Sequence, residues 1–198
     1  MKPVNKHQLL DHLEASVERH LHLAIYHFQN QPVEVLLAPS VTGGWSMAQC
    51  LEHLNRYGDF YLPAMMRALD RRAGRADNPT FTGTWFGNYF TRMMQPDTGR
   101  RKIKAMKAYA PPPQLDGYAV VAEFIHQQET LLGLLRRARQ ADLTATRVPL
   151  SIAPFFRLRL GDVFGFVIAH DERHVQQALR HIPHSRFEIQ NLASHHAS

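Results

Sequence analysis

Apolar residues recur at intervals of three and four along four long segments of the chain, a period that is typical of helices with one buried face. Prolines and glycines are concentrated between these segments. The pattern predicts long helices at residues 6–29, 47–72, 118–141 and 161–181. Four helices of about 20–25 residues each are typical of a four-helix bundle, so we expect an all-α fold of this kind.

The second of these helices has recognisable start signals. Ser46 is a favourable N-cap residue, and Gln49, three positions later, completes a capping-box pattern. Pro63 lies inside the apolar pattern and removes one backbone hydrogen-bond donor. We therefore expect the helix to begin at Met47 and to be kinked or divided at Pro63.

The connections after the second and third predicted helices contain the remaining predicted elements. Residues 74–116 are too many for a simple hairpin between the second and third helices, and their segment TWFGNYFTRMM predicts a short helix. The segment RVPLSIAPFF, within the later connection at residues 142–159, predicts a short extended piece. We expect residues 1–184 to form one domain and the polar residues 185–198 to fray.

Composition narrows the class of protein. The chain has 198 residues, of which 44% are hydrophobic and 20% are charged, an ordinary balance for a globular domain. Its one cysteine, Cys50, cannot form an intramolecular disulfide. No apolar run approaches the roughly 20 residues that cross a membrane, and the first residues lack the pattern of a signal peptide. These features predict a cytoplasmic protein without a membrane partner.

The net charge of +6 raises the question of a nucleic-acid partner. Much of this charge lies in GRRKIKAMK, residues 99–107, which would either contact phosphates or form a solvated loop. No recognition helix or zinc-finger pattern surrounds it, so we expect the loop and no nucleic-acid partner. Bundles of this size often pair, which makes a homodimer compatible with the sequence, although the sequence shows no interface.

Three histidines are candidates for chemistry. His170 and His174 are four residues apart on the last predicted helix, so their Cβ atoms lie on one face about 5–6 Å apart and can share one metal ion. His53, beside the apolar stripe of the second helix, would add a third nitrogen and leave at least one position open, as in catalytic zinc sites. With 13 histidines in the chain, chance pairs are expected. Spacing alone therefore leaves a metal site and incidental histidines both open.

The segment GWSMAQCLEHL, residues 44–54, followed by HDERHVQQALRH, residues 170–181, resembles the DinB-like superfamily (DinB/YfiT type). The family pattern has an aromatic residue and a serine at a helix start, a histidine about two turns later, and H-x-x-R-H-x-x-Q in the last helix. The intervening GRRKIKAMKAYAPPPQ is similar to the basic, proline-ended linker of many members. The resemblance extends over residues 9–183.

The resemblance implies a four-helix bundle in which His53, His170 and His174 hold a divalent metal ion, often nickel, zinc or iron. Some members use thiols, namely bacillithiol S-transferases and mycothiol-dependent maleylpyruvate isomerases, whereas many have no known reaction. Three interpretations follow: a metal-dependent enzyme that performs thiol transfer or hydrolysis on a small-molecule substrate, a non-catalytic metal-binding protein for storage, sensing or stress response, and a basic interaction module. We favour the enzyme, with the reaction open because no thiol-binding pattern is recognisable.

Polar residues near the three histidines have alternative roles. Gln49 would either cap its helix or orient a metal ligand. Arg173 would either form an ion pair or contact an anionic substrate, and Gln177 flanks the ligand pair. We expect Asp171 and Glu172 to be solvated.

For several other residues near these segments we expect structural roles. We expect Cys50 to be a small buried hydrophobe, Trp45 to pack at the start of its helix, and the histidines of the first helix to be mostly solvated. Trp85 and Tyr89 would either cover the metal pocket or cover the core.

Overall fold

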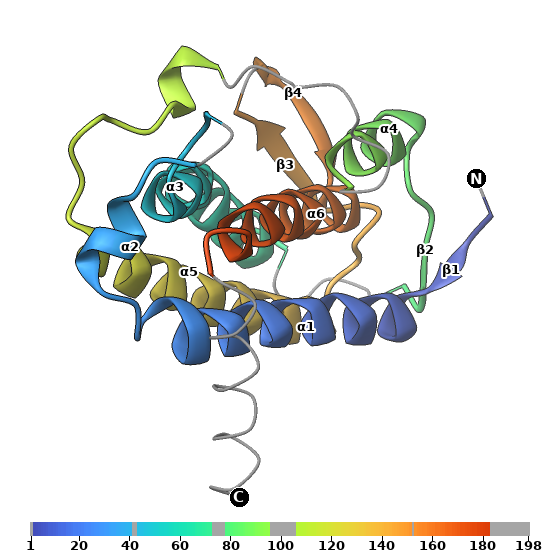
Figure 1. Ribbon diagram of the computed structural model, residues 1–198. Coiled ribbons are helices and arrows are strands. Elements are labelled where there is room, and N and C mark those ends of the chain that lie inside the picture. The colour runs from blue at the N-terminus through green and yellow to red at the C-terminus, as the bar shows by residue number, and fades with distance from the viewer. Residues whose placement is uncertain (1, 41–42, 73–77, 96–105, 152, 183–198) are drawn as a thin grey trace, which may run out of the picture.

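The computed structural model describes residues 2–40, 43–72, 78–95, 106–151 and 153–182, and most of these residues are helical (Figure 1). The long helices are α1 (Lys6–Leu23), α3 (Met47–Asp70), α5 (Gly117–Ala138) and α6 (Leu160–Leu179). α1 and α3 each pack against both α5 and α6. Every long helix therefore has two long neighbours, and its apolar stripe is buried between them.

Shorter elements occupy the connections. The helical ones are a π-helical turn that continues α1 (Ala24–Phe28), α2 (Val33–Leu37), α4 (Trp85–Met94) and a 3₁₀ turn (Lys107–Tyr109). The strands form two antiparallel pairs, β1 (Val4–Asn5) with β2 (Thr80–Phe81) and β3 (Arg147–Leu150) with β4 (Ala153–Arg159). No helix in the described part of the chain has both the length and the apolar character to cross a membrane.

The long helices agree with the predicted ranges to within a few residues, and the short helix predicted at TWFGNYFTRMM is confirmed as α4. The single extended piece predicted at RVPLSIAPFF, residues 147–156, is β3 together with the first part of β4, and these strands pair with each other as an antiparallel hairpin that was not predicted. The pairing of β1 with β2 was not predicted either. The predicted tail at 185–198 and most of the basic segment 99–107 lie outside the described residues.

The start of α3 follows its sequence closely. Ser46 Oγ accepts a hydrogen bond from Gln49 N, and Gln49 Oε1 accepts one from Ser46 N, so the predicted capping box is confirmed. Pro63 does not divide the helix, which is continuous from Met47 to Asp70. Proline leaves the carbonyl oxygen of Asp59 without its helical donor, but Asp59 is exposed and water can supply that donor.

The apolar core consists of two clusters that follow one another along α6. One cluster includes α6 residues up to Ile168, and the other begins on α6 at Val175. Residues 170–174 lie between the two clusters and carry five polar or charged side chains in succession before Val175. The site described below belongs to this polar layer.

Candidate metal centre

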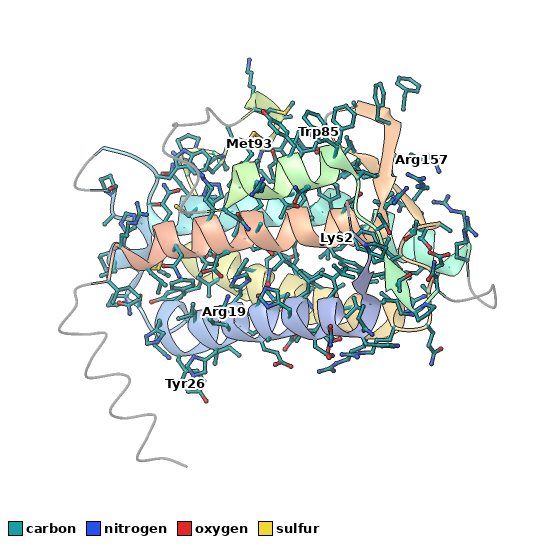
Figure 2. All side chains as sticks on the ribbon, turned by 90° about the vertical axis from the view of Figure 1, so that its right-hand side faces the viewer. Lys2, Arg19, Tyr26, Trp85, Met93 and Arg157 are labelled. Carbon is teal, nitrogen blue, oxygen red and sulfur yellow. The ribbon has the colours of Figure 1, made fainter. Side chains whose placement is uncertain are left out.

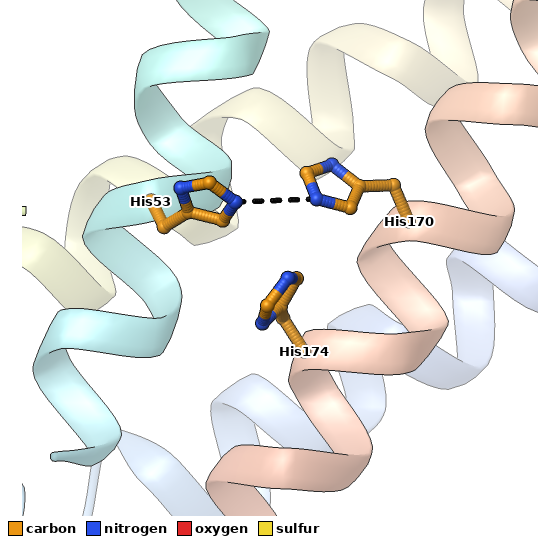
Figure 3. Close-up of side chains that lie close together, drawn as sticks. All are labelled: His53, His170 and His174. Carbon is orange, nitrogen blue, oxygen red and sulfur yellow. Dashed lines mark hydrogen bonds between the residues drawn. The ribbon is translucent and has the colours of Figure 1, made fainter. Parts of the chain in front are cut away.

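His53 on α3 meets His170 and His174 on α6, although 117 residues separate the first two (Figure 3). The Nε2 atoms of His53 and His170 are 3.2 Å apart. One ring nitrogen from each of the three histidines lies within 4.8 Å of the others. The structure therefore brings all three predicted ligands to one place.

Local structure explains why these rings converge. His170 and His174 are one helical turn apart, so both side chains lie on the face of α6 that packs against α3. On α3 the capping box fixes the helix start, and His53 follows Ser46 by two turns. His53 and His170 are each only 3% exposed, and His174 is partly buried.

Hydrogen bonds to the outer ring nitrogens fix which nitrogen faces the cluster. His53 Nδ1 lies 2.7 Å from the carbonyl oxygen of Tyr109, which can only accept, so Nδ1 carries the proton. His174 Nδ1 likewise donates to Gln177 Oε1 at 3.1 Å. In a neutral imidazole the other nitrogen then carries a free lone pair. His53 and His174 thus present the Nε2 lone pairs that a metal ion requires.

The spacing of the nitrogens suits metal coordination. Two imidazoles bound to one ion at bond lengths of about 2.0–2.1 Å place their nitrogens about 3.3 Å apart in a tetrahedral arrangement. The 3.2 Å between the Nε2 atoms of His53 and His170 is close to this value. Imidazole nitrogens are typical ligands of zinc, nickel and iron. The donor set and its spacing therefore fit a divalent transition metal.

Burial keeps the three imidazoles neutral. It lowers the pKa of His170 well below its usual range, and electrostatic interactions with His174, His53 and Arg173 lower it further. Burial also lowers the pKa of His174 to about 3. For His53, burial lowers the pKa more than the hydrogen bond to the Tyr109 carbonyl raises it. Each ring is therefore neutral near neutral pH, as metal ligation requires.

Aromatic rings surround the cluster. The Trp45 ring lies 4.7 Å from that of His53 and 5.7 Å from that of His174, between centroids. The Tyr57 ring lies 4.5 Å from that of His170. Burial raises the pKa of the Tyr57 hydroxyl to about 12, so this group stays neutral. Trp45 packs at the start of α3 as expected, and in that position it also lines the site.

Two of these contacts were not identified from the sequence. Tyr57 follows His53 by four residues, a spacing that could have placed it on the same helix face. The Tyr109 carbonyl carries no side-chain signal, because any residue at that position presents a carbonyl.

The residues proposed to assist the histidines have different outcomes. Gln49 Oε1 is occupied by the capping box, so the structure shows its capping role. Gln177 contacts His174 directly. Arg173 is partly buried, and its positive charge lowers the pKa of both His170 and His174.

The expectation that Asp171 and Glu172 are solvated is wrong. Asp171 is buried and its Oδ2 accepts a hydrogen bond from Gln128 on α5. Glu172 Oε2 accepts hydrogen bonds from His20 Nε2 and Arg19 on α1. α6 has packed neighbours on opposite sides at this level, so residues on the face away from the histidines meet other helices instead of water.

Most of the histidines at residues 6–29 are solvated as expected, namely His7, His12 and His22. His20 and His27 are the exceptions, because both are buried. Cys50 is a buried free thiol, as expected, and burial raises its pKa to about 12. The group of candidate ligand atoms that lie within 4.8 Å of one another comes from His53, His170 and His174, and Cys50 does not belong to it.

Comparison with known protein families supports the resemblance seen in the sequence. The model of the DinB superfamily, whose members are generally metal-binding, matches residues 16–178, a range that contains all three histidines. No curated protein and no solved structure matches the chain. Because the family match covers most of the sequence, the chain belongs to the DinB superfamily.

Proposed function

We propose that this protein is a metal-dependent enzyme in which His53, His170 and His174 hold one nickel, zinc or iron ion. In this proposal α1, α3, α5 and α6 are the four-helix bundle of the family. The observation that carries it is the pair of outer hydrogen bonds to Tyr109 and Gln177, because they set the tautomers of two histidines as metal ligands.

The proposed chemistry uses a coordination position left open by three protein ligands. A bound divalent ion lowers the pKa of a thiol or water ligand and so supplies a nucleophile near neutral pH. The protein contributes a positive environment, since the charge of Arg173 acts on His170 and His174 and that of Arg56 acts on His53. Positive charges of this kind favour an anionic ligand such as a thiolate.

The aromatic rings support the same interpretation. The Trp45 ring lies against His53 and His174, and the Tyr57 ring lies against His53 and His170, so both rings leave less of the cluster open to water. Exclusion of water strengthens electrostatic interactions at the site and protects a reactive nucleophile. We therefore propose thiol transfer to a small electrophile, with hydrolysis as the alternative reaction. A single buried thiol also suits a reducing compartment, and we propose the cytoplasm.

The test is turnover by metal-loaded protein. Protein loaded with nickel, zinc or iron is incubated with low-molecular-weight thiols and electrophiles, and thiol consumption is measured. We expect turnover that His174→Ala abolishes and that His126→Ala, which changes an exposed histidine on α5, leaves intact. Stoichiometric metal binding without turnover of any thiol or ester would instead indicate a non-catalytic metal-binding protein.

A further inference from the structure

Large aromatic side chains are exposed on two neighbouring elements, α4 and β4. Their exposed fractions are 68% for Trp85, 60% for Phe86, 51% for Tyr89, 99% for Phe155 and 71% for Phe156. We call these five residues the aromatic face. On α4 the Trp85 ring lies 5.0 Å from that of Phe86 and 5.6 Å from that of Tyr89, between centroids. Exposed apolar patches on a folded domain often mark an interaction site.

The elements that carry the aromatic face are firmly joined to α6. Asp162, in the first turn of α6, accepts hydrogen bonds from both the backbone nitrogen and the hydroxyl of Thr84, the N-cap of α4. A Cβ atom on Gly87 would come within 2.2 Å of the Asp162 carboxyl carbon, so glycine is required for this close approach. Arg159, at the end of β4, donates a hydrogen bond to the carbonyl oxygen of Thr82.

These contacts hold α4 and the β3–β4 hairpin on one side of the molecule. Figure 2 shows Trp85 and Arg157 on the same side, away from α1, and Figure 1 shows α4 and β4 as neighbours there. The aromatic side chains are therefore presented by a preformed surface.

The charged residues of the segments that form this surface are all basic. Residues 80–95 and 147–159 contain four arginines and no aspartate or glutamate, the arginines being Arg92, Arg147, Arg157 and Arg159. Arg157 and Arg147 are exposed. Residues in a strand alternate between its two sides, so Phe155 and Arg157 project from one side of β4 and Phe156 from the other, and all three side chains are exposed.

We propose that the aromatic face docks this protein onto an anionic lipid surface. Aromatic rings settle at the boundary between lipid headgroups and acyl chains, and nearby arginines are attracted to anionic headgroups. A second copy of the chain is a poorer occupant, because a two-fold interface would bring the same arginines together. The protein would bind at the membrane surface without a spanning helix. This proposal departs from the expectation of no membrane partner, and it does not depend on the metal site.

The test measures binding of the full chain to vesicles of phosphatidylcholine with and without phosphatidylserine. We expect binding that depends on phosphatidylserine and weakens as salt is raised. Phe155→Ser with Phe156→Ser should weaken it at least about tenfold, since each ring loses its buried contact with lipid. Arg157→Gln should weaken it about fivefold through the lost headgroup attraction.

The control is Tyr26→Ser with Tyr118→Ser, which removes two exposed aromatic residues from other elements and should leave binding unchanged. Circular dichroism verifies that each variant is folded, and Arg157→Gln tests the proposal if the double phenylalanine variant is not. Equal binding of wild type and Arg157→Gln, or no dependence on phosphatidylserine, overturns it. So does a wild-type dimer in solution that the phenylalanine substitutions dissociate, because the face is then an interface between copies.

Discussion

His53 donates its Nδ1 proton to the carbonyl oxygen of Tyr109 over 2.7 Å, joining α3 to the turn at Lys107–Tyr109. This main-chain contact leaves His53 Nε2 as an acceptor, 3.2 Å from His170 Nε2. At this spacing His170 Nε2 is the donor to His53 Nε2. If His170 is to hold a metal ion through Nε2, its ring proton would have to lie on Nδ1.

Gln177 supports His174 through a side chain, which makes its contribution testable. We expect Gln177→Ala to weaken metal affinity by about 10–100-fold, because His174 loses the partner of its Nδ1 proton. Gln176→Ala is the matched control, since Gln176 donates to Glu172 instead of contacting a histidine. Isothermal titration with nickel or zinc measures both variants. An unchanged affinity in Gln177→Ala would show that this hydrogen bond does not orient the ligand.

Trp45 is expected to report metal binding by its fluorescence. Its ring centroid is 4.7 Å from that of His53, whereas Trp85, the other tryptophan in the chain, is largely exposed on α4. Nickel bound by the three histidines should quench Trp45 emission in a Trp85→Phe background, with saturation at one ion per chain. The reciprocal variant, Trp45→Phe, should show little quenching at the same nickel concentration. Quenching of Trp85 alone would mean that nickel binds elsewhere.

Cys50 is expected to be unreactive in the folded protein. Burial raises its pKa to about 12, so almost no thiolate exists at pH 8. A chromogenic disulfide reagent should modify the native chain very slowly and the urea-unfolded chain at once. Metal affinity should be the same in Cys50→Ala as in the wild type. Rapid modification of the native thiol, or loss of metal in the variant, would place Cys50 in the site after all.

Asp162 is expected to contribute a stability that decreases as pH rises. In ordinary acid unfolding, by contrast, stability increases as pH rises from acid. Burial raises its pKa above 3.8 despite the hydrogen bonds from Thr84. The folded state then binds this proton more tightly than the unfolded state, so the free energy of unfolding falls as pH rises from 3.8 through the folded pKa. Asp162→Asn has no such proton and should lack this component.

Urea unfolding of the two proteins at several pH values measures this effect. The stability of wild type relative to Asp162→Asn should decrease as pH rises through the window and become constant above it. Glu129→Gln, which removes an exposed carboxylate from α5, should show no such trend. A relative stability of the wild type that increases with pH in this window contradicts the account.

Much of the fold follows from local sequence rules. The apolar period located the long helices, and Ser46 with Gln49 located the start of α3, because both signals depend on neighbouring residues only. The pairing of β3 with β4 was missed because RVPLSIAPFF was interpreted as one extended piece, and the turn between the two strands has no strong sequence signal. Pro63 did not divide α3, since the cost of proline depends on whether the freed carbonyl reaches water, which only the packed structure shows.

Part of the candidate site could also be predicted from signals between neighbouring residues. The spacing of His170 and His174 is a local signal, and the resemblance to a family added His53. The burial of Asp171 and His20 was missed, because a polar residue is stable inside a protein only when distant partners such as Gln128 and Glu172 satisfy it. Those partners come from other helices, and sequence spacing does not reveal them.

The most direct measurement is the metal content of the protein, purified without a histidine tag or nickel resin and dialysed against nickel, zinc or iron. The account predicts one ion per chain for the wild type and for His126→Ala, whose histidine lies on the surface of α5. It predicts loss of that ion in His53→Ala, because His170 and His174 alone form a weaker pair. Absence of bound metal in the wild type, or full retention in His53→Ala, would contradict it.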